Sequence, residues 1–286
     1  MKRCLKLMRV HHYIKNLLIF AALACSGQFF NFEKLSAGIV GFVAFCMVSS
    51  VVYIINDIRD REKDRQHPTK CTRPIAAGTV SVKSAWTLAA ILLVIAFICN
   101  YLIFHTATAI LLALYLLLNL AYSFGLKNIP IVDITILVAG FLIRIMYGAL
   151  VTEITISNWL YLTVIALSFY FALGKRRNEL KQSGSGDTRQ VLKFYPILFL
   201  DKNMNMCLTL ANVFYALWSM DESTMAFYHN RYLIVTVPVV LLITMKYSLD
   251  IEGDSDGDPV EVLLHDKILL VLCILYLAVM FLILYL

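Results

Sequence analysis

Long stretches without a charged residue dominate the hydropathy pattern of this chain. A helix needs about 20 mostly apolar residues to cross the hydrocarbon core of a bilayer. The uncharged runs fall at residues 16–32, 36–55, 84–126, 154–174, 203–220, 232–245 and 268–286. The 84–126 run is long enough for two spans, with a break near 100–105, and the apolar stretch 134–151 carries a single charge, Arg144. The pattern predicts an all-α membrane protein with nine transmembrane helices, of which 232–245 is the shortest.

The composition agrees with this pattern. The 286 residues are 60% hydrophobic and 15% charged, with a mean hydropathy of +0.76. Ordinary globular proteins are about 25% charged, and a soluble domain of this size could not bury so much apolar surface. These values exclude a disordered chain and a disulfide-stapled secreted domain. The seven cysteines are scattered without a CxxC pair, so we expect no disulfide or zinc framework.

The positions of the basic residues predict the orientation. With the N-terminus inside, 22 of the 25 Lys and Arg fall in the segments 1–15, 56–83, 122–133, 174–202 and 246–267, and the exterior turns hold only Lys34 and Arg231. This follows the positive-inside rule. It predicts one domain, 1–286, in the plasma membrane, with the N-terminus and the loops 56–83, 174–202 and 246–267 in the cytoplasm and the C-terminus outside.

Two other interpretations of the charge pattern are less favourable. The net charge of +6 could suggest a nucleic-acid partner, but its distribution favours a membrane protein. The N-terminal segment has features of a signal peptide, with basic residues, an apolar stretch and small residues near Ala24. We interpret it as a retained first span, because the charge balance of the other spans is consistent with it in place.

Four oxygen-bearing side chains cluster where the second span meets the cytoplasm. They are Asn56, Asp57, Asp60 and Asp64, and their spacing places them on one helix face. Carboxylates on one face repel each other unless a cation neutralises them, and Mg²⁺ takes a few protein oxygens together with water and phosphate. The pattern favours a Mg²⁺ site at these four residues, with the three aspartates catalytic. The alternative is a solvated helix end whose acids pair with adjacent arginines and lysines.

A short basic loop follows this cluster. His67-Pro68 ends the helix, since the residue before a proline disfavours the helical region. Lys70 and Arg73 come next. A metal site with adjacent Lys and Arg suits a diphosphate, because the metal bridges its oxygens and the fixed cations cover the remaining charge.

Here the sequence resembles a known family. The stretch NDIRDREKD is similar to the NDxxDxxxD signature of the UbiA-type intramembrane transferases, and HPTKCTRPIAAG after it is also typical of them. The resemblance implies nine transmembrane helices around a cytoplasm-facing polar cavity, with a diphosphate held through Mg²⁺.

Aromatic prenyltransferases of this superfamily carry a second aspartate-rich motif after span six, and this chain lacks it. The corresponding segment reads FALGKRRNELKQSGSGDTRQ, with Lys175, Arg176 and Arg177 in place of a DxxxD pair and only Glu179 as a nearby acid before Asp187. Three adjacent cations suit phosphate capture better than a second metal. The alternative is a positive-inside anchor, which accounts for part of the charge.

Four further stretches resemble the decaprenyl-phosphate phosphoribosyltransferase branch. They are MRVHHYIKNLLIFAAL, the YSFGLKNIPIVDITILVAGFLIRIMYGAL block, LGKRRNEL and KYSLDIEGDSDGDPVEVLLHDKILL. This resemblance implies a phosphoribosyl diphosphate donor and a polyprenyl phosphate acceptor in the membrane. The positions that it places near the substrates are Lys15, Asn56, Asp57, Asp60, Asp64, Lys70, Arg73, Tyr122, Lys127, Arg144, Lys175, Arg176 and Glu179.

The chemistry favours the same branch. Phosphoribosyl diphosphate carries a diphosphate and a 5-phosphate, and the sequence offers two basic or metal-binding clusters, at 56–64 and 175–177. The expected reaction transfers the 5-phosphoribosyl group to the lipid phosphate and releases diphosphate, whose charge Mg²⁺ and the cations stabilise. An alternative is prenyl transfer to an aromatic or other acceptor. A transporter is disfavoured, because no inverted repeat is evident.

Two charges lie in or beside the predicted spans. Arg144 is costly in the membrane unless it faces a polar cavity, and we expect a functional role, the alternative being a pair with a carboxylate of another span. Asp133 follows Pro130 at a helix start, and helix capping explains it.

Overall fold

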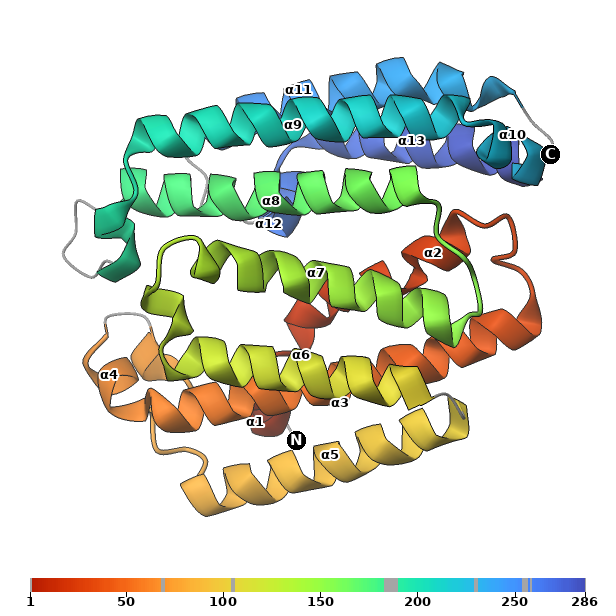
Figure 1. Ribbon diagram of the computed structural model, residues 1–286. Helices are drawn as coiled ribbons and strands as arrows, with labels where there is room; N and C mark the ends of the chain where they lie inside the picture. Colours follow the sequence, from red (N-terminus) through yellow and green to blue (C-terminus); the bar gives the residue numbers. More distant parts are fainter. Residues whose placement is uncertain are drawn as a thin grey trace. The chain divides into compact units, whose positions relative to one another are not determined.

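The computed structural model describes residues 2–67, 70–103, 106–182, 190–228, 231–253, 257 and 259–285. Within these residues the regular elements are all helices (Figure 1). The chain divides into two compact units. Unit 1 contains Met1–Ala24, Gln28–Gly125 and Ile143–Thr155, and unit 2 contains Cys25–Gly27, Leu126–Leu142 and Ile156–Leu286. Parts of the predicted loops 174–202 and 246–267, including Asp187, lie outside the described residues.

Unit 1 is built around one long helix, α3, which packs along α5 and also contacts α6, η1 and α1. Its elements are α1 (Lys2–Met8), η1 (Val10–Phe20), α2 (Ala21–Ala24), α3 (Phe32–Arg59), α4 (Arg61–Gln66), η2 (Lys70–Thr72), α5 (Val82–Ile103), α6 (Thr106–Phe124) and the second half of α7 (Val132–Val151). The side chain of Asn31 caps α3 by accepting the Lys34 N–H at 3.1 Å, which satisfies one of the free donors at the helix start. Fully buried Phe45 and Tyr147 belong to one apolar cluster of this unit.

Unit 2 contains the first half of α7 and the C-terminal helices. Its other elements are η3 (Leu126–Asn128), α8 (Asn158–Lys181), η5 (Gln190–Phe194), α9 (Ile197–Met220), α10 (Glu222–Tyr228), η6 (Tyr232–Val235), α11 (Thr236–Glu252), α12 (Pro259–His265) and α13 (Lys267–Tyr285). The helix pairs α8–α9 and α11–α13 pack against each other. Tyr170, Leu200 and Ile251 lie in its larger apolar core, and Trp218 and Leu233 lie in a second cluster.

Six of the described helical segments are long and apolar enough to cross a membrane. They are Phe32–Arg59, Val82–Ile103, Thr106–Phe124, Val132–Val151, Tyr232–Glu252 and Lys267–Tyr285. Helices α8 and α9 fall outside this group, and each carries charged and amide side chains at one end. The all-helical fold class is confirmed, whereas the count of nine spans and the cytoplasm-facing cavity stay predictions.

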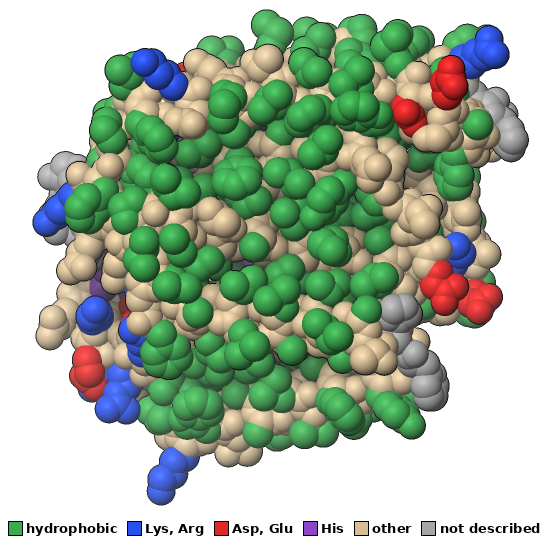
Figure 2. Space-filling model, in the orientation of Figure 1, with side chains coloured by type: hydrophobic (Ala, Val, Ile, Leu, Met, Phe, Trp, Pro, Cys, Tyr) green, Lys and Arg blue, Asp and Glu red, His purple; other side chains and the backbone are tan. Residues whose placement is uncertain are grey.

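The outer face of α5 has the character of a surface in contact with lipid. Phe97 is 73% exposed, and Val94 and Ile98 beside it are also exposed. Hydrophobic side chains cover this helix in the space-filling view (Figure 2). Apolar patches of this kind mark interaction surfaces in soluble proteins, but on a helix of this length and hydropathy they suit a hydrocarbon environment.

The N-terminal apolar run does not form one continuous α-helix. Residues 16–32 begin inside the 3₁₀ segment η1 and end after the four-residue helix α2. The backbone of η1 lies directly against α7, where a Cβ added at Gly148 would be 1.9 Å from the Ile19 carbonyl oxygen. Tertiary packing against a glycine therefore positions this segment, and hydropathy alone could not indicate it.

Other helix limits follow the sequence more closely. The predicted break in the 84–126 run is confirmed, because α5 ends at Ile103 and α6 begins at Thr106. Helix α8 continues through Lys181, so the predicted cytoplasmic segment 174–202 begins as two further helical turns. This extension places Lys175, Arg176 and Glu179 on a helix.

Candidate functional site

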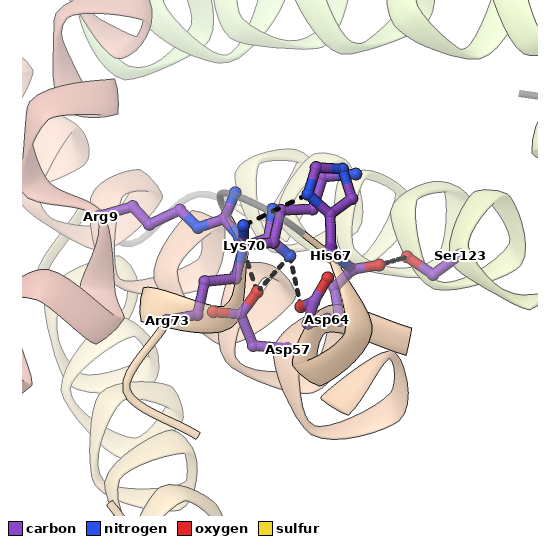
Figure 3. A network of polar contacts seen from close by, with 8 residues as sticks. Arg9, Asp57, Asp64, His67, Lys70, Arg73 and Ser123 are labelled. Carbon is purple, nitrogen blue, oxygen red and sulfur yellow. Dashed lines mark hydrogen bonds and ion pairs between the residues drawn. The ribbon is translucent and has the colours of Figure 1, made fainter. Parts of the chain in front are cut away.

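Two buried aspartates of the predicted metal cluster come together in unit 1. Asp57 on α3 is 2% exposed and Asp64 on α4 is 4% exposed. Nη1 of Arg73 donates to Asp64 Oδ2 at 2.6 Å and to Asp57 Oδ1 at 3.3 Å. Nη2 of Arg9 also donates to Asp57 Oδ1, at 2.6 Å. The carboxylates therefore face each other across the Arg73 guanidinium (Figure 3).

The turn after α3 produces this arrangement. Helix α3 ends at Arg59, and Asp60 leaves the helical region with φ −89° and ψ 6° before α4 begins at Arg61. The Asp64 N–H still donates to the Asp60 carbonyl at 2.9 Å. Arg65 Nε then donates to the Ala76 carbonyl at 3.2 Å, which ties α4 to the loop that carries Arg73.

Asn56 and Asp60 occupy different surroundings in the same cluster. The Asn56 Oδ1 atom accepts a hydrogen bond from Ser123 Oγ on α6 at 3.1 Å, and this bond connects the motif helix to α6. Asp60 is half-buried at the junction of α3 and α4. The structure thus brings Asp57 and Asp64 onto one guanidinium, and their assignment together with Asn56 and Asp60 as metal ligands stays a prediction.

The donor chemistry of this cluster fits Mg²⁺. Among the residues that the structure describes, no three His, Cys, Asp or Glu side chains form a metal-binding group by themselves. Mg²⁺ usually binds through one or two carboxylates and completes its shell with water and substrate phosphate. Asp57 and Asp64, two buried carboxylates directed at the same positive group, provide such a pair.

Arg9 is a site residue that the sequence analysis missed. It lies between α1 and η1 in the left-handed region, with φ 52° and ψ 50°, a conformation uncommon for a residue other than glycine. Its guanidinium carbon lies 4.9 Å from the centre of the Tyr53 ring, and Lys6 Nζ nearby donates to the Thr72 carbonyl at 3.1 Å. Since 48 positions separate Arg9 from Asp57, no local spacing could have revealed the contact.

Four of the positions implied by the resemblance have less specific surroundings. Lys70 is exposed on η2, and its backbone N–H donates to His67 Nδ1 at 3.3 Å. Lys15 on η1 and Tyr122 on α6 are half-buried in unit 1, and Lys127 is half-buried on η3 in unit 2. Their roles toward the substrates stay predictions.

Arg144 lies in a buried polar cluster of unit 1, as its cost in a membrane requires. It is 7% exposed. Its Nε donates to Asn16 Oδ1 at 2.9 Å and its Nη2 donates to the Tyr115 hydroxyl at 3.0 Å. The guanidinium carbon also lies 5.1 Å from the centre of the Phe45 ring. An amide, a phenol and aromatic faces therefore receive this cation.

A second buried network, in unit 2, surrounds Asp133. Arg176 is fully buried, and its Nε donates to Asp133 Oδ2 at 2.6 Å while its Nη1 donates to Glu179 Oε2 at 2.8 Å. The Tyr195 hydroxyl donates to Asp133 Oδ1 at 2.6 Å and accepts the Ile131 N–H at 2.5 Å. Asp133 thus binds two other elements, so helix capping is an insufficient explanation for it. Sequence analysis also missed Tyr195, which is 62 positions away.

The remaining cations of this segment also meet carboxylates. Arg177 is bound to Asp201 on α9 and donates to Glu252 on α11 at 2.8 Å. Lys181 reaches the same Glu252 at 3.1 Å. Arg176 and Arg177 therefore connect α8 to neighbouring elements through ion pairs, whereas Lys175 is half-buried. Phosphate binding by Lys175 and Arg176, with Glu179 beside them, stays a prediction.

Comparison with known proteins identifies the family. The sequence profile of the UbiA prenyltransferase family matches residues 17–263. The chain belongs to the UbiA prenyltransferase family. Its relatives in this family include the decaprenyl-phosphate phosphoribosyltransferase of Mycolicibacterium smegmatis, 36% identical over 94% of this chain and 88% of that protein. The enzyme of the same name from Corynebacterium glutamicum is 34% identical over 94% of this chain and 83% of that protein. The resemblance drawn from the motifs is confirmed.

Solved structures of the UbiA family have the same fold. A UbiA homolog from Archaeoglobus fulgidus bound to GPP and Mg²⁺ superposes with a TM-score of 0.67 at 18% identity, covering 99% of both chains. A structure of digeranylgeranylglyceryl phosphate synthase gives a TM-score of 0.68 at 18% identity over 97% of both chains. With its apolar helices, membership of this family makes the chain an integral membrane protein.

Proposed function

We propose that this protein transfers the 5-phosphoribosyl group of phosphoribosyl diphosphate to a polyprenyl phosphate and releases diphosphate. The observation that carries the proposal is the 36% identity to a decaprenyl-phosphate phosphoribosyltransferase over 94% of this chain. The segment 175–187 supports it, because lysine and arginines stand where aromatic prenyltransferases of the superfamily carry a second aspartate-rich motif.

The cluster around Asp57 supplies what loss of a diphosphate requires. Asp57 and Asp64, with Asn56 and Asp60, would hold Mg²⁺, which neutralises charge on the leaving diphosphate when bound. Arg9 and Arg73 provide fixed positive charge beside the two buried aspartates, and Lys70 follows in the same loop. Guanidinium groups suit this task, because they bind phosphate oxygens with two donors and stay protonated.

The acceptor needs little activation. A lipid phosphate is already ionised near neutral pH and attacks the sugar carbon as the diphosphate leaves, so the reaction requires no general base. The proposed topology has nine spans, with the N-terminus and the reacting groups at the cytoplasmic side of the plasma membrane. There the site is open to phosphoribosyl diphosphate, the water-soluble donor.

The test uses membranes that contain the protein. They are given phosphoribosyl diphosphate labelled in the ribose together with polyprenyl phosphates of several chain lengths, and label extracted into organic solvent is measured. The expected result is Mg²⁺-dependent transfer that requires the lipid phosphate. An Asp57→Asn variant expressed to the same level serves as the control.

Two results would overturn the proposal. One is the absence of lipid-linked label with every polyprenyl phosphate in membranes where the protein is folded. The other is efficient prenylation of an aromatic acceptor from geranyl or farnesyl diphosphate, which would favour the prenyltransferase alternative.

A further inference from the structure

Arg73 occupies the point where two carboxylates of the motif converge. A single nitrogen of its guanidinium, Nη1, lies 2.6 Å from Asp64 Oδ2 and 3.3 Å from Asp57 Oδ1. A cation held between Asp57 and Asp64 through these two oxygens would occupy the place of this nitrogen. Arg73 and a cation bound in that way cannot hold the two oxygens at the same time.

The two buried carboxylates already have an equal number of cationic partners without an added ion. Asp57 and Asp64 carry two negative charges, and Arg9 and Arg73 bring two positive charges within 3.3 Å of them. Side-chain exposure is 3% for Asp57 and 6% for Asp64, so water screens these charges weakly. A divalent cation entering this balanced group meets strong repulsion from Arg73 unless the guanidinium moves away.

The surroundings of Arg73 allow that movement. Its side chain is 25% exposed, against 17% for Arg9. Its backbone is fixed on both sides, since its N–H donates to the Lys70 carbonyl at 3.0 Å and its carbonyl accepts from Ala77 at 2.8 Å. Rotation of the side chain alone can release the carboxylates. Arg9 is held more firmly, because its guanidinium also lies over the Tyr53 ring.

We propose that Arg73 is an internal competitor for the metal ligands, so that cation binding and release of the Arg73 guanidinium occur as one coupled step. The inference rests on the metal-dependent function proposed above. Before the cation binds, the arginine stabilises the two buried carboxylates, and the entering divalent cation then replaces it. The released guanidinium would stay next to these carboxylates, where it could bind oxygens of the diphosphate.

Substitution of Arg73 distinguishes a competitor for the metal ligands from a residue that assists metal binding. Removal of a residue that assists a metal site weakens metal binding, whereas removal of a competitor strengthens it. A charge-assisted hydrogen bond typically corresponds to a tenfold or larger effect. Arg73→Gln is therefore expected to bind a divalent cation about tenfold more tightly than the natural protein. Arg73→Lys keeps the competing charge and is expected to stay within about threefold of it.

The experiment measures cation binding directly, without turnover. The purified full chain in detergent is titrated with Mn²⁺, and electron paramagnetic resonance reports the free ion. Arg61→Gln is the matched control, because Arg61 belongs to the same motif but pairs with exposed Glu62 at 3.0 Å. Asp64→Asn removes one of the two carboxylates and is expected to abolish the gain when combined with Arg73→Gln.

A second measurement guards against misfolding of the Gln variant. Loss of Arg73 leaves Asp57 and Asp64 with one fewer counter-charge, so the variant is expected to unfold at a lower temperature without divalent cation. Added Mg²⁺ should then stabilise Arg73→Gln more than it stabilises the natural protein. Arg61→Gln should respond to Mg²⁺ as the natural protein does.

The outcomes separate this inference from the function on which it rests. Equal or weaker Mn²⁺ binding by Arg73→Gln, in a chain whose natural form binds Mn²⁺, overturns the competition and leaves the metal-dependent function standing. Tighter binding by Arg73→Lys to the same degree as Arg73→Gln overturns it also, because charge would then not be the cause. If no form of the protein binds Mn²⁺, the proposed metal site fails together with this inference.

Discussion

Two groups of buried charges in the described residues largely neutralise themselves. Asp57 and Asp64 lie with Arg9 and Arg73 in unit 1. In unit 2, fully buried Arg176 binds Asp133 and Glu179. An isolated charge would cost several kilocalories per mole in such surroundings, so these pairings make buried charge possible. Substitution of one member of a group therefore leaves its partners without their counter-charge.

The motif residues Asn56 and Asp60 provide a first test at the residue scale. Asn56→Ala or Asp60→Ala is expected to abolish Mg²⁺-dependent turnover while leaving membrane insertion intact, since each removes a proposed metal-binding oxygen at the C-terminal end of α3. Turnover is measured in membranes matched for protein content. Near-normal activity in both variants would remove these two side chains from the mechanism.

Lys175 tests the proposed binding of the donor by the basic segment of α8. Lys175→Gln is expected to raise the KM for phosphoribosyl diphosphate about tenfold, because it removes a charge-assisted contact, with little effect on the KM for the lipid. Lys175 is a better choice than Arg176, whose removal would leave buried Asp133 without its cation. An unchanged donor KM would argue against the assignment, and Lys181→Gln on the same helix is the control.

Tyr195 offers a test through pH. Burial and the hydrogen bond to Asp133 raise the pKa of Tyr195 from 10.0 to about 12. A raised folded-state pKa means that this stabilisation is complete below pH 10 and is lost as the pH rises from 10 towards 12. Tyr195→Phe is expected to lower the free energy of unfolding by about 1–3 kcal/mol near neutral pH.

The measurement for Tyr195 is thermal unfolding in detergent across alkaline pH. The natural protein should lose stability more steeply than Tyr195→Phe between pH 10 and 12, since only the natural protein can ionise this hydroxyl. Parallel curves for the two proteins would contradict the assigned hydrogen bond to Asp133.

At the scale of elements, the N-terminal segment depends on a close backbone approach. The η1 segment reaches α7 at Gly148, where a side chain would collide with the carbonyl, carbon and Cα atoms of Ile19. These are backbone atoms, which cannot rotate away as the end of a side chain could, so little adjustment is possible. The same segment carries Asn16, which accepts a hydrogen bond from buried Arg144. The close approach at the glycine therefore also helps to position Asn16 for this bond.

Gly148→Ala tests this packing. The added methyl group would lie 1.9 Å from the Ile19 oxygen, so η1 must shift, and we expect a destabilisation of about 3 kcal/mol or more. Gly174→Ala is the control, because its Cβ would meet only the side-chain ends of Met204 at 3.3 Å and Ile251 at 3.5 Å. Unfolding in detergent compares the two variants. Similar stabilities would show that η1 does not require the glycine.

At the scale of the whole molecule, the predicted membrane topology accounts for the distribution of charge along the chain. The predicted cytoplasmic segments hold 22 of the 25 basic residues, and the proposed diphosphate-binding motif requires access to a soluble donor. Exposed apolar side chains such as Phe97 and Val94 on α5 suit contact with lipid. Both features follow from placing a transferase inside a bilayer.

Cysteine labelling tests the predicted orientation. In a background without the natural cysteines, Lys34→Cys is expected to react with a membrane-impermeant maleimide added outside intact cells. Arg61→Cys should react only after the membrane is permeabilised, since the positive-inside rule places residues 56–83 in the cytoplasm. The reverse pattern would overturn the orientation. Both positions have partly exposed side chains in unit 1, which makes them suitable for labelling.

Hydropathy and motif spacing together are enough to predict several features of this protein from its sequence. The family, the helical fold class and the break between α5 and α6 follow from the sequence, because twenty apolar residues and an i, i+4 spacing are local properties. The clustering of Asp57 and Asp64 was predicted from a shared helix face, but the turn at Asp60 between α3 and α4 brings them together. These features depend on residues that are close together in the chain.

Only the tertiary structure decided the partners of the buried charges. Arg9 meets Asp57 across 48 positions, Ser123 meets Asn56 across 67 and Arg176 meets Asp133 across 43. The passage of η1 against Gly148 is equally non-local. The sequence indicates which charged side chains need an ion-pair or hydrogen-bond partner, since a buried charge is costly wherever it lies. The packing of distant helices decides which group becomes that partner, because it brings together side chains that no local spacing relates.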